Sequence, residues 1–198
     1  MQNRKVEIQA HLHRNAQLCE QTTIACADSI LGVADLIADT FRAGGKLLLC
    51  GNGGSAADSQ HMAAEFVSLL TQDFQRPGLP AIALTTDTSF LTAYANDFGF
   101  DGVFERQVRT LGRAGDLLIG ISTSGNSANV LRAIQAAGEM GMMTVGLSGL
   151  GGEMSKHVDR AVVVPSQSTQ HIQEVLLSIE HIICFLVERQ IFTEWGLA

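Results

Sequence analysis

The sequence predicts one α/β domain built on a parallel sheet that helices cover on both faces. After residue 44, short apolar runs recur five times, each bounded by glycine or polar residues. A stretch long enough for a helix separates successive runs, and this alternation is typical of a parallel sheet. The length of 198 residues is sufficient for a single domain with its own core. We therefore expect one domain over 1–198, with an α/β core over 44–192 and a helical extension over 1–43.

The N-terminal extension is expected to contain two helices, broken near Ala27 and Asp28. Glycine and proline are absent before Gly32. Apolar residues then recur at the spacing of an amphipathic helix: Ile30, Val33, Ala34, Ile37 and Phe41. The excess of apolar positions here, and on the last helix, indicates that both take part in subunit contacts.

The remaining elements follow in order after the Gly44-Gly45 stop. The expected strands are Lys46 to Cys50, Ala81 to Leu84, Leu117 to Ile121, Met143 to Leu147 and Ala161 to Val164. The expected helices span residues 55–70, 87–96, 102–113, 126–140 and 168–190. The last is apolar around much of its circumference, which is typical of a central or interfacial helix.

Composition narrows the class of function. The net charge is −7, with 17% charged residues, which argues against a nucleic-acid surface. Four cysteines without close pairing indicate a reducing compartment and are expected to be buried. No apolar stretch resembles a signal peptide or a membrane span, so a cytoplasmic protein without membrane contact is expected.

Two turns at strand ends could hold a phosphate. The first provides Asn52, Gly53, Gly54 and Ser55, and the second provides Ser122, Thr123, Ser124 and Ser127 around Gly125. Glycines allow close approach of the backbone, and hydroxyls with helix N-termini can bind an anion without Lys or Arg. Either turn alone could also be a tight turn with a helix cap. Their combination favours binding of a sugar phosphate.

Two pairs of polar residues are candidates for acid/base chemistry or for binding a metal. His61 and Glu65 are four residues apart and share a helix face, a spacing that is also common on solvated faces. Gln173 and His181 lie in the apolar last helix, where polar groups need partners. Eight helical residues rise ~12 Å, so these two must lean toward each other to reach one ion.

The sequence gives less indication of a role for the other histidines. His11, His13 and His157 have no such neighbours in the sequence and are expected to be surface or packing residues. For His171 no assignment follows from the residues alone.

Five segments together resemble the phosphoheptose isomerases of the sugar isomerase (SIS) domain family. These are CGNGGSAADSQHMAAEF, LPAIALTTDTS, ANDFGF, GDLLIGISTSGNSANV, and the late IQE with His181. The resemblance covers about residues 44–192. It implies a five-stranded parallel flavodoxin-like sheet, a homotetramer with active sites between subunits, and one zinc ion per subunit.

The resemblance also implies roles for individual residues. Glu65 and His181 match the family's acid/base pair, and His61, Glu65, Gln173 and His181 match its zinc ligands. The substrate contacts would be Asn52, Gly53, Gly54, Ser55, Glu65, Asn96, Asp97, Ser122, Thr123, Ser124, Ser127 and Gln173. His171 departs from the family, which usually has Arg or Lys before IQE.

The implied activity is conversion of sedoheptulose 7-phosphate to D-glycero-D-manno-heptose 7-phosphate. This aldose–ketose isomerisation would be the first step of ADP- or GDP-heptose synthesis for lipopolysaccharide core or other surface glycans. Two alternatives remain: a non-catalytic adaptor of the same fold that binds the replication initiator protein, and a regulator that senses a sugar phosphate. Retention of Glu65 and His181 favours the enzyme, because such adaptors typically replace these groups.

Overall fold

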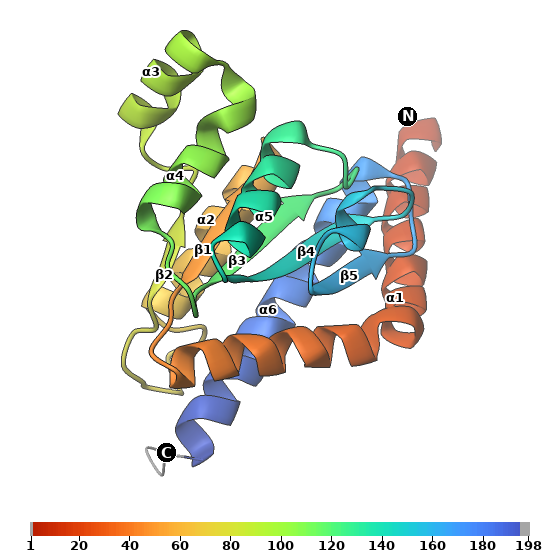
Figure 1. The fold of residues 1–198 in the computed structure, drawn as a ribbon. Helices are drawn as coiled ribbons and strands as arrows, with labels where there is room; N and C mark the ends of the chain where they lie inside the picture. The colour runs from red at the N-terminus through yellow and green to blue at the C-terminus, as the bar shows by residue number, and fades with distance from the viewer. Residues whose placement is uncertain (1, 195–198) are drawn as a thin grey trace.

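The computed structural model describes residues 2–194 and the side chains of residues 4–192. One sheet lies between layers of helices (Figure 1). All its strand pairs are parallel, in the order β2-β1-β3-β4-β5, which is the flavodoxin-like order that the family resemblance implied. The strands are β1 (Leu47–Gly51), β2 (Ala81–Ala83), β3 (Leu117–Ser122), β4 (Met143–Gly149) and β5 (Arg160–Val164).

The helices match the expected positions after residue 44, with ends that differ by a few residues. They are α1 (Gln2–Arg42), α2 (Gly54–Val67), α3 (Thr88–Phe98), α4 (Val103–Leu111), α5 (Ala128–Glu139) and α6 (Thr169–Glu194). Short 3₁₀ turns are η1 (Phe100–Gly102) and η2 (Met154–Lys156).

The expectation of two N-terminal helices was wrong, because α1 is one helix of 41 residues. It nevertheless bends, since the part nearer the N-terminus runs in a different direction from the part that leads to β1 (Figure 1). The hydroxyls of Thr23 and Ser29 donate to the backbone carbonyls of Cys19 and Cys26. Such back-bonding bends a helix without ending it.

The core lies on both faces of the sheet, as the alternation of strand side chains requires. Leu47 and Leu49 of β1 point to a cluster shared with α1, α2 and α6. Leu48 and Cys50 point to the opposite face, where they pack with residues of α4 and α5. The continuous apolar strands thus reflect burial on both faces.

Three of the four cysteines are buried, as expected. Cys26, Cys50 and Cys184 are buried thiols, whereas Cys19 is exposed on α1, so the expectation of burial was wrong for that residue. Within residues 2–194, no helix combines the length and the apolar character needed to cross a membrane.

A buried ion pair fastens the segment after α2 to α6. The side chains of Arg76 and Glu188 are 1% and 0% exposed, with Nε and Oε2 2.9 Å apart. Arg76 also donates to the carbonyls of Glu65 and Phe66 at the end of α2. Its guanidinium therefore satisfies helix-end acceptors that α2 itself cannot pair.

Removing the guanidinium should destabilise the fold strongly. In Arg76→Ala, Glu188 stays buried without its counter-charge, so we expect a loss of about 3–5 kcal/mol in the free energy of unfolding. Lys156→Ala, which breaks an exposed pair with Glu153, should change it by less than about 1 kcal/mol. Urea denaturation measures both, and equal losses would show that Arg76 is not a structural anchor.

Candidate functional site

The two candidate phosphate-binding turns lie side by side at the carboxyl edge of the sheet. Parallel pairing aligns Cys50 with Gly120 and Gly51 with Ile121, so β1 and β3 end together. The chain then enters α2 after one strand and α5 after the other. In open α/β sheets, ligands bind at this edge.

Local geometry explains the glycines of the first turn. Gly53 has a φ of 57°, in the left-handed region that favours glycine. A Cβ on Gly54 would lie 2.1 Å from the Gln173 amide nitrogen. The turn can therefore pass directly beneath the Gln173 side chain, because residue 54 has no side chain of its own.

A pair of amides holds the two turns together. Asn52 Nδ2 donates to Asn129 Oδ1 at 2.8 Å, and Asn129 Nδ2 donates back to Asn52 Oδ1 at 2.9 Å. Asn129 is buried and lies in the first turn of α5. The side chain of Asn52 thus serves to align the two helix N-termini.

Three hydroxyls gather in the second turn. Ser122 Oγ lies 2.9 Å from Ser127 Oγ and 3.4 Å from Ser124 Oγ. Gly125, with a φ of 65°, reverses the chain between them, and Thr123 follows Ser122 with its side chain partly exposed. The turn presents a compact set of donors to one point.

The first turns of α2 and α5 are available to an anion. Neither helix has a side-chain cap: Gly53 has none to offer, and the Ser127 hydroxyl is directed to Ser122. Backbone N–H groups of an uncapped first turn carry partial positive charge and can donate to phosphate oxygens. A phosphate can therefore bind here although the protein is acidic.

Beside these turns the structure brings together three of the four candidate metal ligands. His61 Nε2 lies 2.7 Å from His181 Nε2 and 3.6 Å from Glu65 Oε1. One ligand atom from each residue lies within 4.8 Å of the others. Helix α2 supplies His61 and Glu65, four residues apart on one face, and α6 supplies His181 across the contact.

The donor set fits a zinc ion. Two imidazoles and a carboxylate are ordinary zinc ligands, and bonds of about 2.0–2.1 Å at tetrahedral angles put ligand atoms about 3.4 Å apart. The separation of His61 from Glu65 matches this distance, and the two imidazoles would open by about 0.7 Å from their 2.7 Å separation.

Gln173, on α6, lies beside Asp58, which precedes His61 by about one turn of α2. Its amide contacts Gly54, and its Nε2 lies 3.5 Å from Asp58 Oδ1. Asp58 precedes His61 by three residues on α2, so Gln173 lies between the phosphate turn and the histidines. Burial raises the pKa of Asp58, although the hydrogen bond from Gln173 acts in the opposite direction.

A second acidic group lies buried behind the cluster. Glu180 is 0% exposed, and neither carboxylate oxygen has a hydrogen-bond partner among the described residues. Burial, with the neighbouring charge of Asp58, raises the pKa of Glu180 to about 8. Glu180 is thus protonated at neutral pH and adds no net charge next to His181.

Asn96 and Asp97 lie away from these residues within one chain. Both are exposed on α3, where Asn96 Nδ2 donates to Asp97 Oδ1, and α3 stands at the margin of the molecule (Figure 1). Asp97 lines a 420 Å³ pocket with Phe90, Tyr94 and Arg106. Substrate contact by these two residues stays a prediction.

Sequence reasoning missed Asp58, Asn129 and Glu180. Asp58 and Asn129 stand inside the quoted motifs, three residues before His61 and two after Ser127. The place of Asp58 three residues before His61 on one helix face is the signal that could have found it, whereas no local pattern marks Asn129. For Glu180 the corresponding signal is its place within the apolar last helix.

The chain belongs to the SIS domain family, whose model matches residues 10–149. The sequence is similar to a phosphoheptose isomerase of Roseiflexus sp. (strain RS-1), with 57% identity over 169 residues that cover 85% of each chain. It is 50% identical to a phosphoheptose isomerase of Geobacter sulfurreducens over 187 residues, which are 94% of this chain and 98% of that one.

The fold is similar to that of solved relatives. A phosphoheptose isomerase from Neisseria gonorrhoeae superimposes with a TM-score of 0.87 at 42% identity, over 92% of this chain and 97% of that one. A phosphoheptose isomerase from Francisella tularensis gives a TM-score of 0.88 at 34% identity. The strand order and the long N-terminal helix thus belong to a fold that these relatives share.

Proposed function

We propose that the protein is an aldose–ketose isomerase that converts sedoheptulose 7-phosphate to D-glycero-D-manno-heptose 7-phosphate. The observation that carries the proposal is the convergence of His61, Glu65 and His181 beside two uncapped helix N-termini. Identity of 50–57% to phosphoheptose isomerases over most of the chain supports the same substrate. The product would enter ADP- or GDP-heptose synthesis for lipopolysaccharide or other surface glycans.

The proposed reaction moves one proton between two carbons. Hydroxyls of Ser122, Ser124 and Ser127, with the N–H groups of α2 and α5, hold the phosphate and fix the sugar chain. Glu65 removes the proton from one carbon of the hydroxyketone and returns it to its neighbour through an enediolate. His181 donates and accepts protons at the oxygens, so the carbonyl moves from C2 to C1.

We propose that His61, Glu65, Gln173 and His181 hold one zinc ion per subunit. The close approach of three of these ligands supports a metal at this point. Such an ion would polarise the carbonyl and stabilise negative charge on the oxygens. Gln173 would complete the set by turning its amide from Asp58 toward His61.

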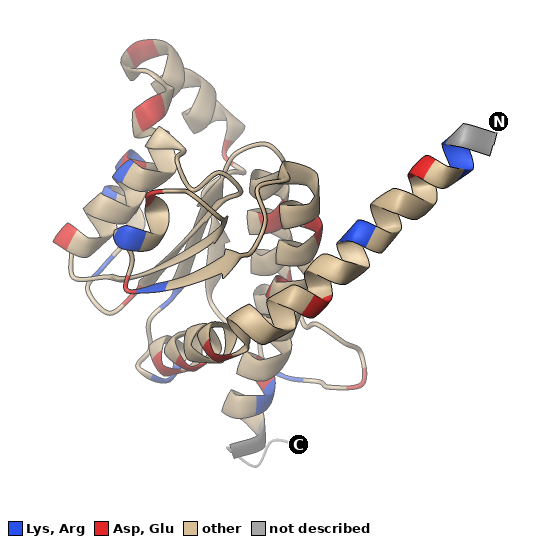
Figure 2. Cartoon of the chain, turned by 90° about the vertical axis from the view of Figure 1, so that its right-hand side faces the viewer, with Lys and Arg blue, Asp and Glu red and all other residues tan. Residues whose placement is uncertain are grey.

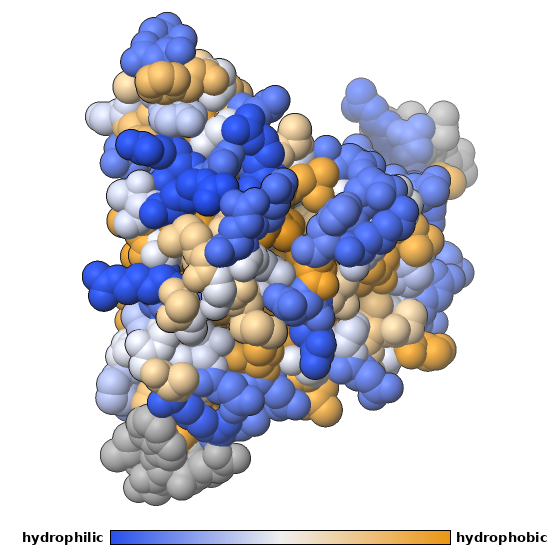
Figure 3. Space-filling view, in the orientation of Figure 1, coloured by the Kyte–Doolittle hydropathy of each residue, from blue (hydrophilic) through white to orange (hydrophobic). Residues whose placement is uncertain are grey.

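We further propose a homotetramer in the cytoplasm with sites at subunit interfaces. Figure 2 shows the first part of α1 projecting from the body of the molecule, and it carries the exposed apolar residues Val6, Ile8 and Leu12. Ile182 and Phe185 of α6 are 47% and 46% exposed. In Figure 3, apolar residues reach the surface between hydrophilic ones over the middle of the face shown. A second chain that covers these residues would remove this apolar area from water.

Glu65→Gln should reduce turnover by about 10²-fold or more, because the amide cannot accept the proton. The assay incubates purified protein with sedoheptulose 7-phosphate and identifies the heptose phosphate by NMR. Glu139→Gln, which changes an exposed carboxylate of α5, is the matched control and should keep full turnover. Undiminished turnover in Glu65→Gln would refute its role as the base, and absence of product with the unaltered protein would refute the isomerase.

Removal of the metal should reduce turnover in parallel with metal content. A chelator should remove activity and Zn²⁺ should restore it, while His61→Ala should lose both because an imidazole ligand is gone. Added Zn²⁺ should also raise the Tm of the unaltered protein, since it binds the folded state. His157→Ala serves as the exposed control. Full activity in a metal-free sample would contradict the proposed zinc.

The oligomer is tested by light scattering at micromolar concentration. We expect the mass of four chains for the unaltered protein. Replacing Leu12 and Ile182 with Ser should shift the mass toward smaller species, because the apolar faces that would meet become polar. A monomer that retains full isomerase activity would overturn the proposal of shared sites.

A further inference from the structure

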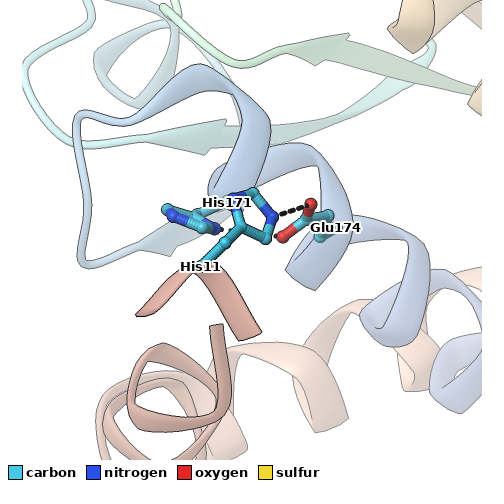
Figure 4. Close-up of side chains that lie close together, drawn as sticks. All are labelled: His11, His171 and Glu174. Carbon is cyan, nitrogen blue, oxygen red and sulfur yellow. Dashed lines mark hydrogen bonds and ion pairs between the residues drawn. The ribbon is translucent and has the colours of Figure 1, made fainter. Parts of the chain in front are cut away.

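A second cluster of metal-binding side chains joins α1 to α6, apart from the candidate active site (Figure 4). His11 Nε2 lies 2.7 Å from Glu174 Oε1, and His171 Nδ1 lies 3.0 Å from Glu174 Oε2. The two imidazole rings are 4.2 Å apart between centroids. Ligand atoms of the three residues lie within 4.8 Å of one another.

We propose that these three side chains form a site for a divalent transition metal of the zinc class. Two imidazole nitrogens and a carboxylate are a donor set that Zn²⁺ and Co²⁺ bind. Tetrahedral bonds of about 2.0–2.1 Å need ligand atoms about 3.4 Å apart, so the two contacts with Glu174 must open by about 0.4–0.7 Å. A movement of this size needs side-chain rotation alone.

The surroundings leave room for a fourth ligand. His171 is 8% exposed, whereas the side chains of His11 and Glu174 are 40% and 37% exposed. A 220 Å³ cavity lies against His171, and a 370 Å³ cavity lies against Glu174. The buried histidine fixes the position of the ion, and the open side admits a water molecule to complete four-coordination.

This site and the candidate active site use different ligands. Glu174 and His181 are seven residues apart on α6, which is about 10 Å along the helix axis. His171 and Glu174 face α1, whereas His181 faces His61 of α2. Each chain would therefore bind two ions that share no ligand.

An ion here would fasten the projecting segment of α1 to the core. His11 lies 163 residues before Glu174 in the sequence, so the bond would join two distant parts of the chain. Binding would stabilise the docked α1, and the stabilisation would rise with the logarithm of the free metal concentration above the Kd. Gln173 lies between His171 and Glu174, so the same bond would restrain the backbone that carries this residue.

The experiment counts metal ions in the purified protein after chelation and titration with Zn²⁺, using elemental analysis. Co²⁺ serves as the second probe, because its visible absorption reports tetrahedral coordination. We expect two ions per chain in the unaltered protein and one in His11→Gln. His13→Gln, an exposed position on the same helix, is the matched control and should bind two.

The two sites are separated by variants. His61→Gln should lose the other ion, and His11→Gln with His61→Gln should bind none. Glu174→Gln repeats the test from α6, so that loss of metal does not rest on one helix. The proposal would be overturned if His11→Gln and Glu174→Gln each bound as many ions as the unaltered protein, with unchanged affinity. A single ion that only His61→Gln removes would overturn it too, and would leave the proposed function intact.

Discussion

The parallel register of β1 against β3 is the constraint on which the site depends. It ends both strands at the same edge, with Gly51 opposite Ile121, and so brings two helix N-termini together. The reciprocal hydrogen bonds of Asn52 and Asn129 then hold the turns in one geometry. Because phosphate binding here uses backbone N–H groups and hydroxyls, a shift of either strand would misalign several donors at once.

Burial of ionisable groups around α6 shows how stability and chemistry are combined. Arg76 neutralises Glu188 and also holds the carbonyl of Glu65, so the ion pair that fastens α6 also fixes the end of α2 that carries the proposed base. Glu180 instead keeps its proton, since burial raises its pKa to about 8. The charge of Glu188 is balanced by Arg76, and Glu180 carries no charge because it keeps its proton. Both carboxyl groups can therefore lie in the apolar surroundings of α6.

The sequence predicted most of the fold because each strand is a continuous apolar run, and such runs indicate burial on both faces. It failed at Ala27 and Asp28, where polar and small residues suggested a break that the long helix absorbs as a bend. Local spacing paired His61 with Glu65, and only the family resemblance joined them to His181. His11 was expected to be a surface or packing residue, because its partner Glu174 is 163 positions away. Contacts of that separation are set by packing of α1 on α6, which no local pattern encodes.

The helical period of α6 separates His171 from Gln173, and the rise along its axis separates Glu174 from His181. Residues 171 and 173 are about 200° apart around the axis, so His171 and Gln173 point in nearly opposite directions. One side meets His11 of α1, and the other meets Gly54 and Asp58 near the phosphate turn. A displacement of α6 relative to α1 would therefore also move Gln173 relative to the turn. Contact with α1 and geometry at the turn thus share one structural element, because His171 and Gln173 are two residues apart on the same helix.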